Sequence, residues 1–208
     1  MNHLVLLGDS VFDNARYTLG SPDVITQVRE VLPVGWQASL VAVDGSTTRE
    51  IPAQVQRVPQ DASNLVLSVG GNDAIMHADI LRMPASSTSE ALSLLADVSA
   101  RFEESYRGAV AACRGMDLPL AICTIYNGSF PDRDYQRQIS TALMVFNDAI
   151  VRVGAELGLS IVDLRLVCSA PADYANPIEP SSIGGQKIAR CIANLVSSNV
   201  GGSRILAV

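Results

Sequence analysis

Short, nearly continuous apolar runs alternate along the chain with longer segments in which apolar and polar positions are mixed. Apolar runs of about four to eight residues are typical of strands that are covered on both faces, whereas longer amphipathic segments favour helices. Strands are therefore predicted at residues 3–7, 38–43, 64–69, 118–125 and 160–164, each rich in Val, Ile or Leu.

Helix-length segments separate these runs. Helices are predicted at residues 22–32, after a cap at Ser21, and at 48–58, 89–114, 133–157 and 182–198, and a loop at 84–89 precedes the third helix. Parallel neighbouring strands need crossover connections, which the helices supply. The pattern therefore predicts an α/β fold, a three-layer α/β/α sandwich with a five-stranded parallel sheet between two helical layers.

Composition adds limits to this fold. With 208 residues, 48% apolar and 17% charged, the chain is expected to form one domain over residues 1–208 with a sizeable core. A net charge of −6 without a run of Lys or Arg excludes recognition of a nucleic-acid backbone. The opening run in MNHLVLLGDS is too short for a signal peptide or a membrane span.

The four cysteines point to an intracellular environment. Cys113, Cys123, Cys168 and Cys191 show neither CxxC nor Cys/His ligand spacing, so they predict no metal site. A chain of this size does not need disulfides for stability. We therefore expect four buried, reduced thiols and a cytoplasmic protein.

Residues with chemical potential follow the first three predicted strands. Gly8-Asp9-Ser10 follows the first, Gly45 follows the second in VDGSTT, and Asn72 follows the third in SVGGNDA. In open parallel sheets, ligands bind beyond the carboxyl ends of the strands. A hydroxyl, a backbone N–H and a side-chain amide at this edge are the groups that acyl transfer needs, a nucleophile and donors to the oxyanion.

This combination resembles the SGNH hydrolases, also called GDSL esterases/lipases. The resemblance runs from Gly8 to about Ile188 and depends on the two tripeptides Gly8-Asp9-Ser10 and Gly71-Asn72-Asp73. It implies a flavodoxin-like α/β/α sandwich and no cofactor. It also implies that Ser10 is the nucleophile, and that the Ser10 N–H, the Gly45 N–H and the Asn72 side chain form the oxyanion site.

The last motif of that family, Asp-x-x-His, is altered here. The corresponding residues are Asn176-Pro177-Ile178-Glu179, so Asn176 stands in place of the aspartate and Glu179 in place of the histidine. An ionised carboxylate can accept the serine proton, but with an ordinary pKa of ~4.3 it is a weaker base than imidazole unless burial raises that pKa. Asn176 removes a charge that would repel Glu179 and offers an amide donor to orient it.

Other interpretations of these positions stay open. Glu179 can instead be a solvated residue near the start of the last helix, where negative charge is favourable. His77, about one turn past Asn72, is a second candidate base, whereas His3 is expected at the surface at the opposite end of the sheet.

We expect the residues around the predicted site to have supporting, non-catalytic roles. Asp9 and Asp73 are expected to bond local backbone N–H groups, and Asn14 to bond the turn that carries Ser10. Aromatic residues in the loop after the fourth strand are candidates for the wall of an acyl or alcohol pocket: Tyr126, Phe130 and Tyr135. The cluster past Asn72 is expected to be helix core: Met76, Ile80, Leu81 and Met83.

The sequence thus predicts a serine esterase that cleaves a small-molecule carboxylic ester through an acyl-enzyme on Ser10, with Glu179 as general base. A carboxylate base predicts activity in more acidic buffer than a histidine enzyme tolerates. The alternative is a catalytically degenerate protein of the same fold that binds a small acylated ligand or a partner. Nothing in the sequence indicates an oligomeric state.

Overall fold

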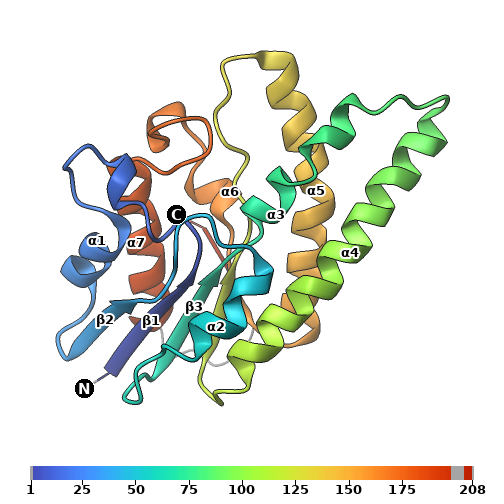
Figure 1. Ribbon diagram of the computed structural model, residues 1–208. Helices are drawn as coiled ribbons and strands as arrows, with labels where there is room; N and C mark the ends of the chain where they lie inside the picture. The colour runs from blue at the N-terminus through green and yellow to red at the C-terminus, as the bar shows by residue number, and fades with distance from the viewer. Residues whose placement is uncertain (1, 198–203, 208) are drawn as a thin grey trace.

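A computed structural model describes residues 2–197 and 204–207, and a parallel sheet runs through its centre (Figure 1). The strand order is β2-β1-β3-β4-β5-β6, in which the first five strands follow the doubly wound order of flavodoxin. The strands are β1 (Asn2–Gly8), β2 (Trp36–Leu40), β3 (Asn64–Ser68), β4 (Leu120–Cys123), β5 (Ser160–Val162) and β6 (Ile205–Leu206).

Alternating side chains of the strands enter two separate cores. In β1, Leu4 and Leu6 face one core, while Val5 and Leu7 face the other. Helices α1 (Val24–Val31), α6 (Leu164–Val167) and α7 (Ser182–Ser197) cover the first face. Helices α2 (Ile51–Val55), α4 (Thr88–Arg114) and α5 (Arg133–Glu156) cover the second, which gives the three layers seen in Figure 1.

The α/β prediction with a parallel sheet is confirmed, but the prediction of five strands is wrong. The sixth strand, β6, has only two residues, too few to show a pattern, and forms by pairing with β5. The second strand was also predicted too late along the chain. It ends at Leu40 because the next two N–H groups, of Val41 and Ala42, both donate to the Leu6 carbonyl and break the regular ladder.

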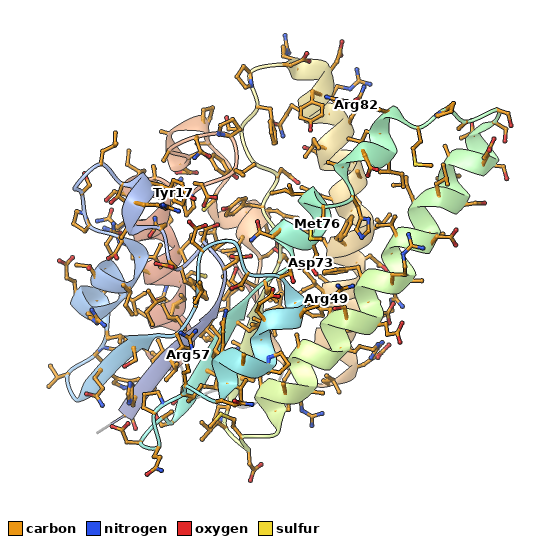
Figure 2. All side chains as sticks on the ribbon, in the orientation of Figure 1. Tyr17, Arg49, Arg57, Asp73, Met76 and Arg82 are labelled. Carbon is orange, nitrogen blue, oxygen red and sulfur yellow. The ribbon has the colours of Figure 1, made fainter. Side chains whose placement is uncertain are left out.

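Several helix predictions differ from the structure, beginning with the first helix, which starts at Val24 and is capped by Asp23 and not by Ser21. The predicted helix at 48–58 is a 3₁₀ turn, η2 (Thr48–Glu50), followed by the short α2. Residues 71–82, for which no helix bounds were predicted, form α3 (Gly71–Ile75) and η3 (Ala78–Arg82) over the carboxyl edge of the sheet, where Asp73 marks α3 and Arg82 marks the end of η3 in Figure 2. The predicted end of the last helix, Ser198, lies outside the described residues. The remaining 3₁₀ turns are η1 (Ala15–Tyr17) and η4 (Pro171–Asp173).

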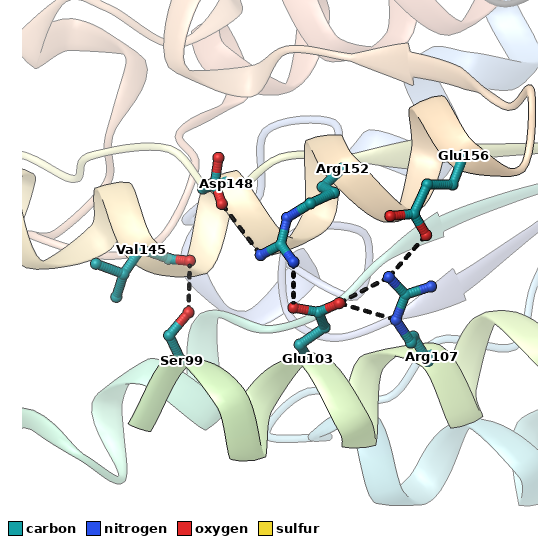
Figure 3. Close-up of polar contacts among 7 residues, drawn as sticks. All are labelled: Ser99, Glu103, Arg107, Val145, Asp148, Arg152 and Glu156. Carbon is teal, nitrogen blue, oxygen red and sulfur yellow. Dashed lines mark hydrogen bonds and ion pairs between the residues drawn. The ribbon is translucent and has the colours of Figure 1, made fainter. Parts of the chain in front are cut away.

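Polar contacts join α4 to α5 along one side (Figure 3). The Glu103 carboxylate binds both Arg107 and Arg152, and Arg107 also reaches Glu156. One turn earlier, the Ser99 hydroxyl donates to the Val145 carbonyl over 3.2 Å. These contacts hold the two helices together below the carboxyl edge of the sheet.

The four cysteines are buried and free, as the sequence predicts. Among the residues that the structure describes, no group of three His, Cys, Asp or Glu side chains could hold a metal ion. Within the same residues, every helix is too short or too polar to cross a lipid bilayer.

Candidate active site

The turn after β1 places Ser10 at the carboxyl edge of the sheet. Gly8 has a φ of +132°, and a Cβ there would lie 1.8 Å from the Ser68 carbonyl oxygen of β3, so a glycine is required. The Phe12 N–H then donates to the Asp9 carbonyl and closes the turn. Ser10 is 7% exposed and lines a pocket, and its N–H has no acceptor among the described residues. That N–H is free to bind a ligand.

Glu179 is carried by a firmly held loop between β5 and α7. Each of the four carbonyls from Pro177 to Pro180 accepts a hydrogen bond. The donors are the Ser129 N–H to Pro177, the Tyr126 hydroxyl to Ile178, the Ala175 N–H to Glu179 and the Asn14 amide to Pro180, at 2.7–3.1 Å. Glu179 is 6% exposed, and α7 begins only at Ser182. The interpretation of Glu179 as a solvated residue is therefore wrong.

Asn176 supports this loop in a different way from the one expected. Its Oδ1 accepts the backbone N–H groups of Ile178 at 2.9 Å and Glu179 at 3.0 Å, which is an Asx turn. The side chain of Asn176 is exposed, and in the described part of the chain it donates no hydrogen bond to the Glu179 carboxylate. Asn176 thus fixes the backbone that carries the carboxylate.

Ser10 and Glu179 line the same pocket, and the Ser10 hydroxyl influences the pKa of Glu179. Burial raises the pKa of Glu179 to about 7, the nearby Ser10 hydroxyl limits the rise, and the negative charge of Asp44 adds to it. The Oε2 atom of Glu179 is buried and has no hydrogen-bond partner in the described residues. Glu179 therefore has a free, buried acceptor in the pocket that Ser10 lines, and burial brings its pKa close to neutral pH.

Asp9 brings a second carboxyl group to the pocket. Its Oδ1 accepts the Val11 N–H at 3.0 Å, so the predicted local bond is confirmed. Burial nevertheless raises the pKa of Asp9 to about 8, and the negative charges of Glu179 and Asp73 contribute to the rise. At neutral pH the Asp9 carboxyl is neutral, a property that the sequence did not indicate.

The expected oxyanion donors differ in their relation to the pocket, since Asn72 lines it and Gly45 does not. Asn72 lines the pocket and donates one Nδ2 hydrogen to the Ser46 carbonyl at 2.9 Å, which leaves its second hydrogen available. Gly45 is exposed, has a φ of +84° and lies outside the pocket lining, and its N–H has no acceptor among the described residues. Its neighbours connect it to the site, since Ser46 binds Asn72 and Asp44 is near Glu179.

Two further predictions for polar residues are wrong. Asn14 is fully buried and bonds the Val24 N–H and the Pro180 carbonyl, not the turn that carries Ser10, so it helps to hold the loop of Glu179. Asp73 accepts hydrogen bonds from the backbone and hydroxyl of Thr48, 25 residues away, where a local bond was expected. Sequence spacing gives no signal for such long-range partners.

The two histidines occupy different regions. His77 is half-buried and lines the pocket between α3 and η3, so it stays a candidate base. The prediction that His3 lies at the surface is wrong, because His3 is 5% exposed. Its ring nitrogens lie 2.7 Å from the Ser39 hydroxyl and 2.8 Å from the Asp61 carboxylate. These three residues lie on β1, β2 and the loop before β3, outside the pocket of Ser10.

The pocket that contains Ser10 has a volume of about 270 Å³. The three aromatic residues expected to wall an acyl or alcohol pocket all line it: Tyr126, Phe130 and Tyr135. The cluster past Asn72 was predicted wrongly as helix core. Ile80 and Leu81 line the pocket, while Met76 and Met83 are exposed, because residues 71–82 form short turns over the pocket rather than a helix packed along its length.

The fold and these strand-end residues define an α/β protein with a GDSL-type site at the carboxyl edge of a parallel sheet. The chain belongs to the GDSL-like lipase/acylhydrolase family, whose model matches residues 6–184. Members of this family are ester hydrolases.

Solved structures with the same fold include three enzymes. An extracellular lipase from Streptomyces rimosus has a TM-score of 0.67 at 16% identity, covering 96% of this chain and 100% of that one. Phospholipase A1 from Streptomyces albidoflavus has 0.65 at 15% identity, covering 96% and 99%. An acetyl xylan esterase from Geobacillus stearothermophilus has 0.62 at 18% identity, covering 96% of each chain. No match was found among curated proteins.

Proposed function

We propose that this protein is a serine esterase that hydrolyses a carboxylic ester through an acyl-enzyme on Ser10, with Glu179 as general base in place of histidine. The observation that carries the proposal is the shared pocket of Ser10 and Glu179, in which the Ser10 hydroxyl influences the pKa of Glu179 and the Glu179 Oε2 atom is buried without a partner among the described residues. Family membership and the lipase and esterase relatives support the reaction class.

In the first half-reaction, the Ser10 oxygen attacks the ester carbonyl carbon while Glu179 takes the hydroxyl proton. The tetrahedral intermediate collapses, the bond to the alcohol oxygen breaks, and Glu179 returns the proton to the leaving alcohol. In the second half-reaction a water molecule attacks the acyl-serine, again losing its proton to Glu179. Ser10 leaves with that proton, and the carboxylic acid is released.

The negative charge on the intermediate needs donors that are already in place. The N–H of Ser10 and the second Nδ2 hydrogen of Asn72 are unused within the described chain and lie at the pocket. The Gly45 N–H completes the set if the turn that Asn72 holds at Ser46 directs it toward the substrate. Neutral Asp9 adds no repulsive charge at pH 7.

Burial makes a glutamate adequate for this role. A carboxylate with an ordinary pKa is a poor acceptor for a serine proton, and raising that pKa brings it close to the value of imidazole. With a pKa of about 7, Glu179 is about half ionised at neutral pH. Asn176 suits such a base, because an aspartate at that position would repel it.

The direct test is covalent labelling of the nucleophile. Incubation with a fluorophosphonate probe is expected to label Ser10, as read by mass spectrometry of the peptide that carries it, together with turnover of p-nitrophenyl acetate and butyrate. A protein that leaves Ser10 unmodified and cleaves neither ester faster than buffer would instead be the catalytically degenerate protein that binds an acylated ligand.

The pH dependence is expected to be bell-shaped. Activity rises as Glu179 ionises, with an acidic limb near pH 7, and so the earlier expectation of activity in more acidic buffer does not hold once burial is included. Above pH 8 the Asp9 carboxyl ionises and places a second negative charge beside the developing oxyanion, so kcat/KM falls again. A pH–rate profile with p-nitrophenyl butyrate measures both limbs.

Two variants test which residue causes each limb of the pH–rate profile. Asp9→Asn keeps the acceptor for the Val11 N–H but cannot ionise, so its alkaline limb is expected to disappear. His77→Gln is expected to keep the acidic limb. Loss of that limb in His77→Gln would make His77 the base, and an alkaline limb that persists in Asp9→Asn would reject the role given to Asp9.

A further inference from the structure

The pocket beside Ser10 has two chemically different parts. Most of its polar lining residues come from loops and short helices at the carboxyl edge of the sheet, such as Ser10, Asn72 and Glu179. Helix α4 and the 3₁₀ turn η3 contribute only hydrocarbon, and α5 adds only one polar group, the Tyr135 hydroxyl. The pocket thus leads from a polar reaction centre into an apolar space between helices.

Aromatic rings bound this space on one side. Phe146 of α5 lines the pocket and packs against Phe102 of α4, with ring centroids 4.9 Å apart. Next to this pair, the Ser99 hydroxyl binds the Val145 carbonyl and joins the two helices directly (Figure 3). A ligand that enters from Ser10 therefore meets an aromatic wall on the side between α4 and α5.

Hydrocarbon walls select against sugars. A sugar hydroxyl placed against Val98, Leu143 or Ile139 would lose its water without gaining a partner, which is unfavourable. An acyl chain placed there gains roughly fourfold in binding for each buried methylene. At roughly 30 Å³ for each water-sized group, a cavity of about 270 Å³ accepts a chain of medium length.

The rim of the pocket is apolar as well. Ile75 and Ile178 both line the pocket and are 49% and 37% exposed. They offer a hydrocarbon path from the surface to Ser10. This feature suits a lipophilic ester that approaches with its chain first.

From this geometry we infer that the pocket holds the acyl group of the substrate, and that the enzyme prefers esters of medium-chain fatty acids, roughly hexanoyl to decanoyl, over short acetyl esters of sugars. The inference rests on the proposed function and specifies its substrate class. It assigns the apolar space between η3, α4 and α5 as the subsite that selects chain length.

The test is a series of p-nitrophenyl esters from acetate to laurate, which share one leaving group. Between acetate and octanoate, kcat/KM is expected to rise at least tenfold, and it should fall again at laurate. A flat or falling series with measurable acetate hydrolysis overturns the inference while the proposed function stands. If acetates of long-chain alcohols show the rise instead, the pocket takes the alcohol and the inference fails.

A variant that fills the pocket tests the subsite, and a second variant on the same helix serves as its control. Val98→Phe projects a ring into the cavity and is expected to lower the ratio of kcat/KM for octanoate to that for acetate at least tenfold. Leu92→Phe, on the same helix but 61% exposed and outside the pocket, should keep the wild-type ratio. Equal octanoate-to-acetate ratios in the two variants would show that the subsite does not lie between α4 and α5.

Binding gives a readout that does not need catalysis. Decanoate is expected to bind the Ser10→Ala protein in a calorimetric titration and to bind its Val98→Phe derivative at least tenfold more weakly. Equal affinity in the two proteins, or none in either, contradicts the subsite. Decanoate binding to the Ser10→Ala protein together with no ester turnover by the wild-type protein would keep the subsite and reject the proposed esterase.

Discussion

Replacing Ser10 with alanine is expected to lower kcat/KM for p-nitrophenyl butyrate by about 10⁴- to 10⁶-fold, because the acyl-enzyme can no longer form. The Ser10 side chain donates to no acceptor in the described residues other than the neighbouring Glu179 carboxylate, so its loss leaves the turn after β1 intact. We therefore expect the thermal unfolding midpoint to stay close to the wild-type value. Ester hydrolysis and thermal unfolding of the same preparation measure the two effects.

Ser39 provides the control for this experiment. It lies 2.7 Å from a ring nitrogen of His3, whose other nitrogen contacts Asp61, so it has the partners of an activated serine. It lies within β2, however, and outside the pocket. Ser39→Ala is expected to keep its activity and to lose some stability, since buried His3 loses a hydrogen bond. If activity were lost in Ser39→Ala and kept in Ser10→Ala, Ser39 and not Ser10 would be the nucleophile.

Local patterns predicted most of the sheet because strands covered on both faces need continuous apolar runs. β1 and β3 were predicted to within two residues for this reason. β2 was predicted too far along the chain, since the apolar residues Val41 and Ala42 continue its pattern. Their N–H groups both donate to the Leu6 carbonyl and so do not continue the regular strand pairing. The end of β2 is therefore set by hydrogen bonds to β1 and not by the apolar pattern, and the sequence does not show these bonds.

The candidate site was predictable where it depends on strand ends. Ser10, Gly45 and Asn72 each lie within five residues after the end of a strand, so parallel strand order alone brings them to one edge. The neighbourhood of Glu179 was not predictable. Asn14, which holds its loop, lies 166 positions from its partner Pro180, and contacts of that range follow from the fold alone.

The electrostatic state of the site was equally hidden in the sequence. Burial sets the pKa of both Glu179 and Asp9, and burial depends on packing by residues from many elements. The motif change from histidine to glutamate suggests a weak base, whereas the folded environment gives a base that titrates near pH 7. The chemistry that a residue type permits is thus decided by its surroundings.

The second large effect is expected at that base. Glu179→Gln keeps the size of the side chain but cannot take a proton, so kcat/KM for p-nitrophenyl butyrate should fall about 10²- to 10⁴-fold. Because burial raises the pKa of Glu179 from 4.5 to about 7, the stability of the wild type falls as pH rises from about 4.5 to about 7 and stays lower above pH 7. The glutamine variant avoids this loss and should unfold at no lower temperature than wild type at pH 8.

Glu30→Gln, an exposed change on α1, is the matched control and should leave both quantities unchanged. Glu179→His with Asn176→Asp rebuilds the usual pair of the family, and an aspartate keeps the Oδ1 that accepts both Asx-turn N–H groups. Activity in this double variant would show that the pocket fits imidazole. Full activity in Glu179→Gln would mean that the proton of Ser10 goes elsewhere, and His77 at the pocket wall would then be the group to replace.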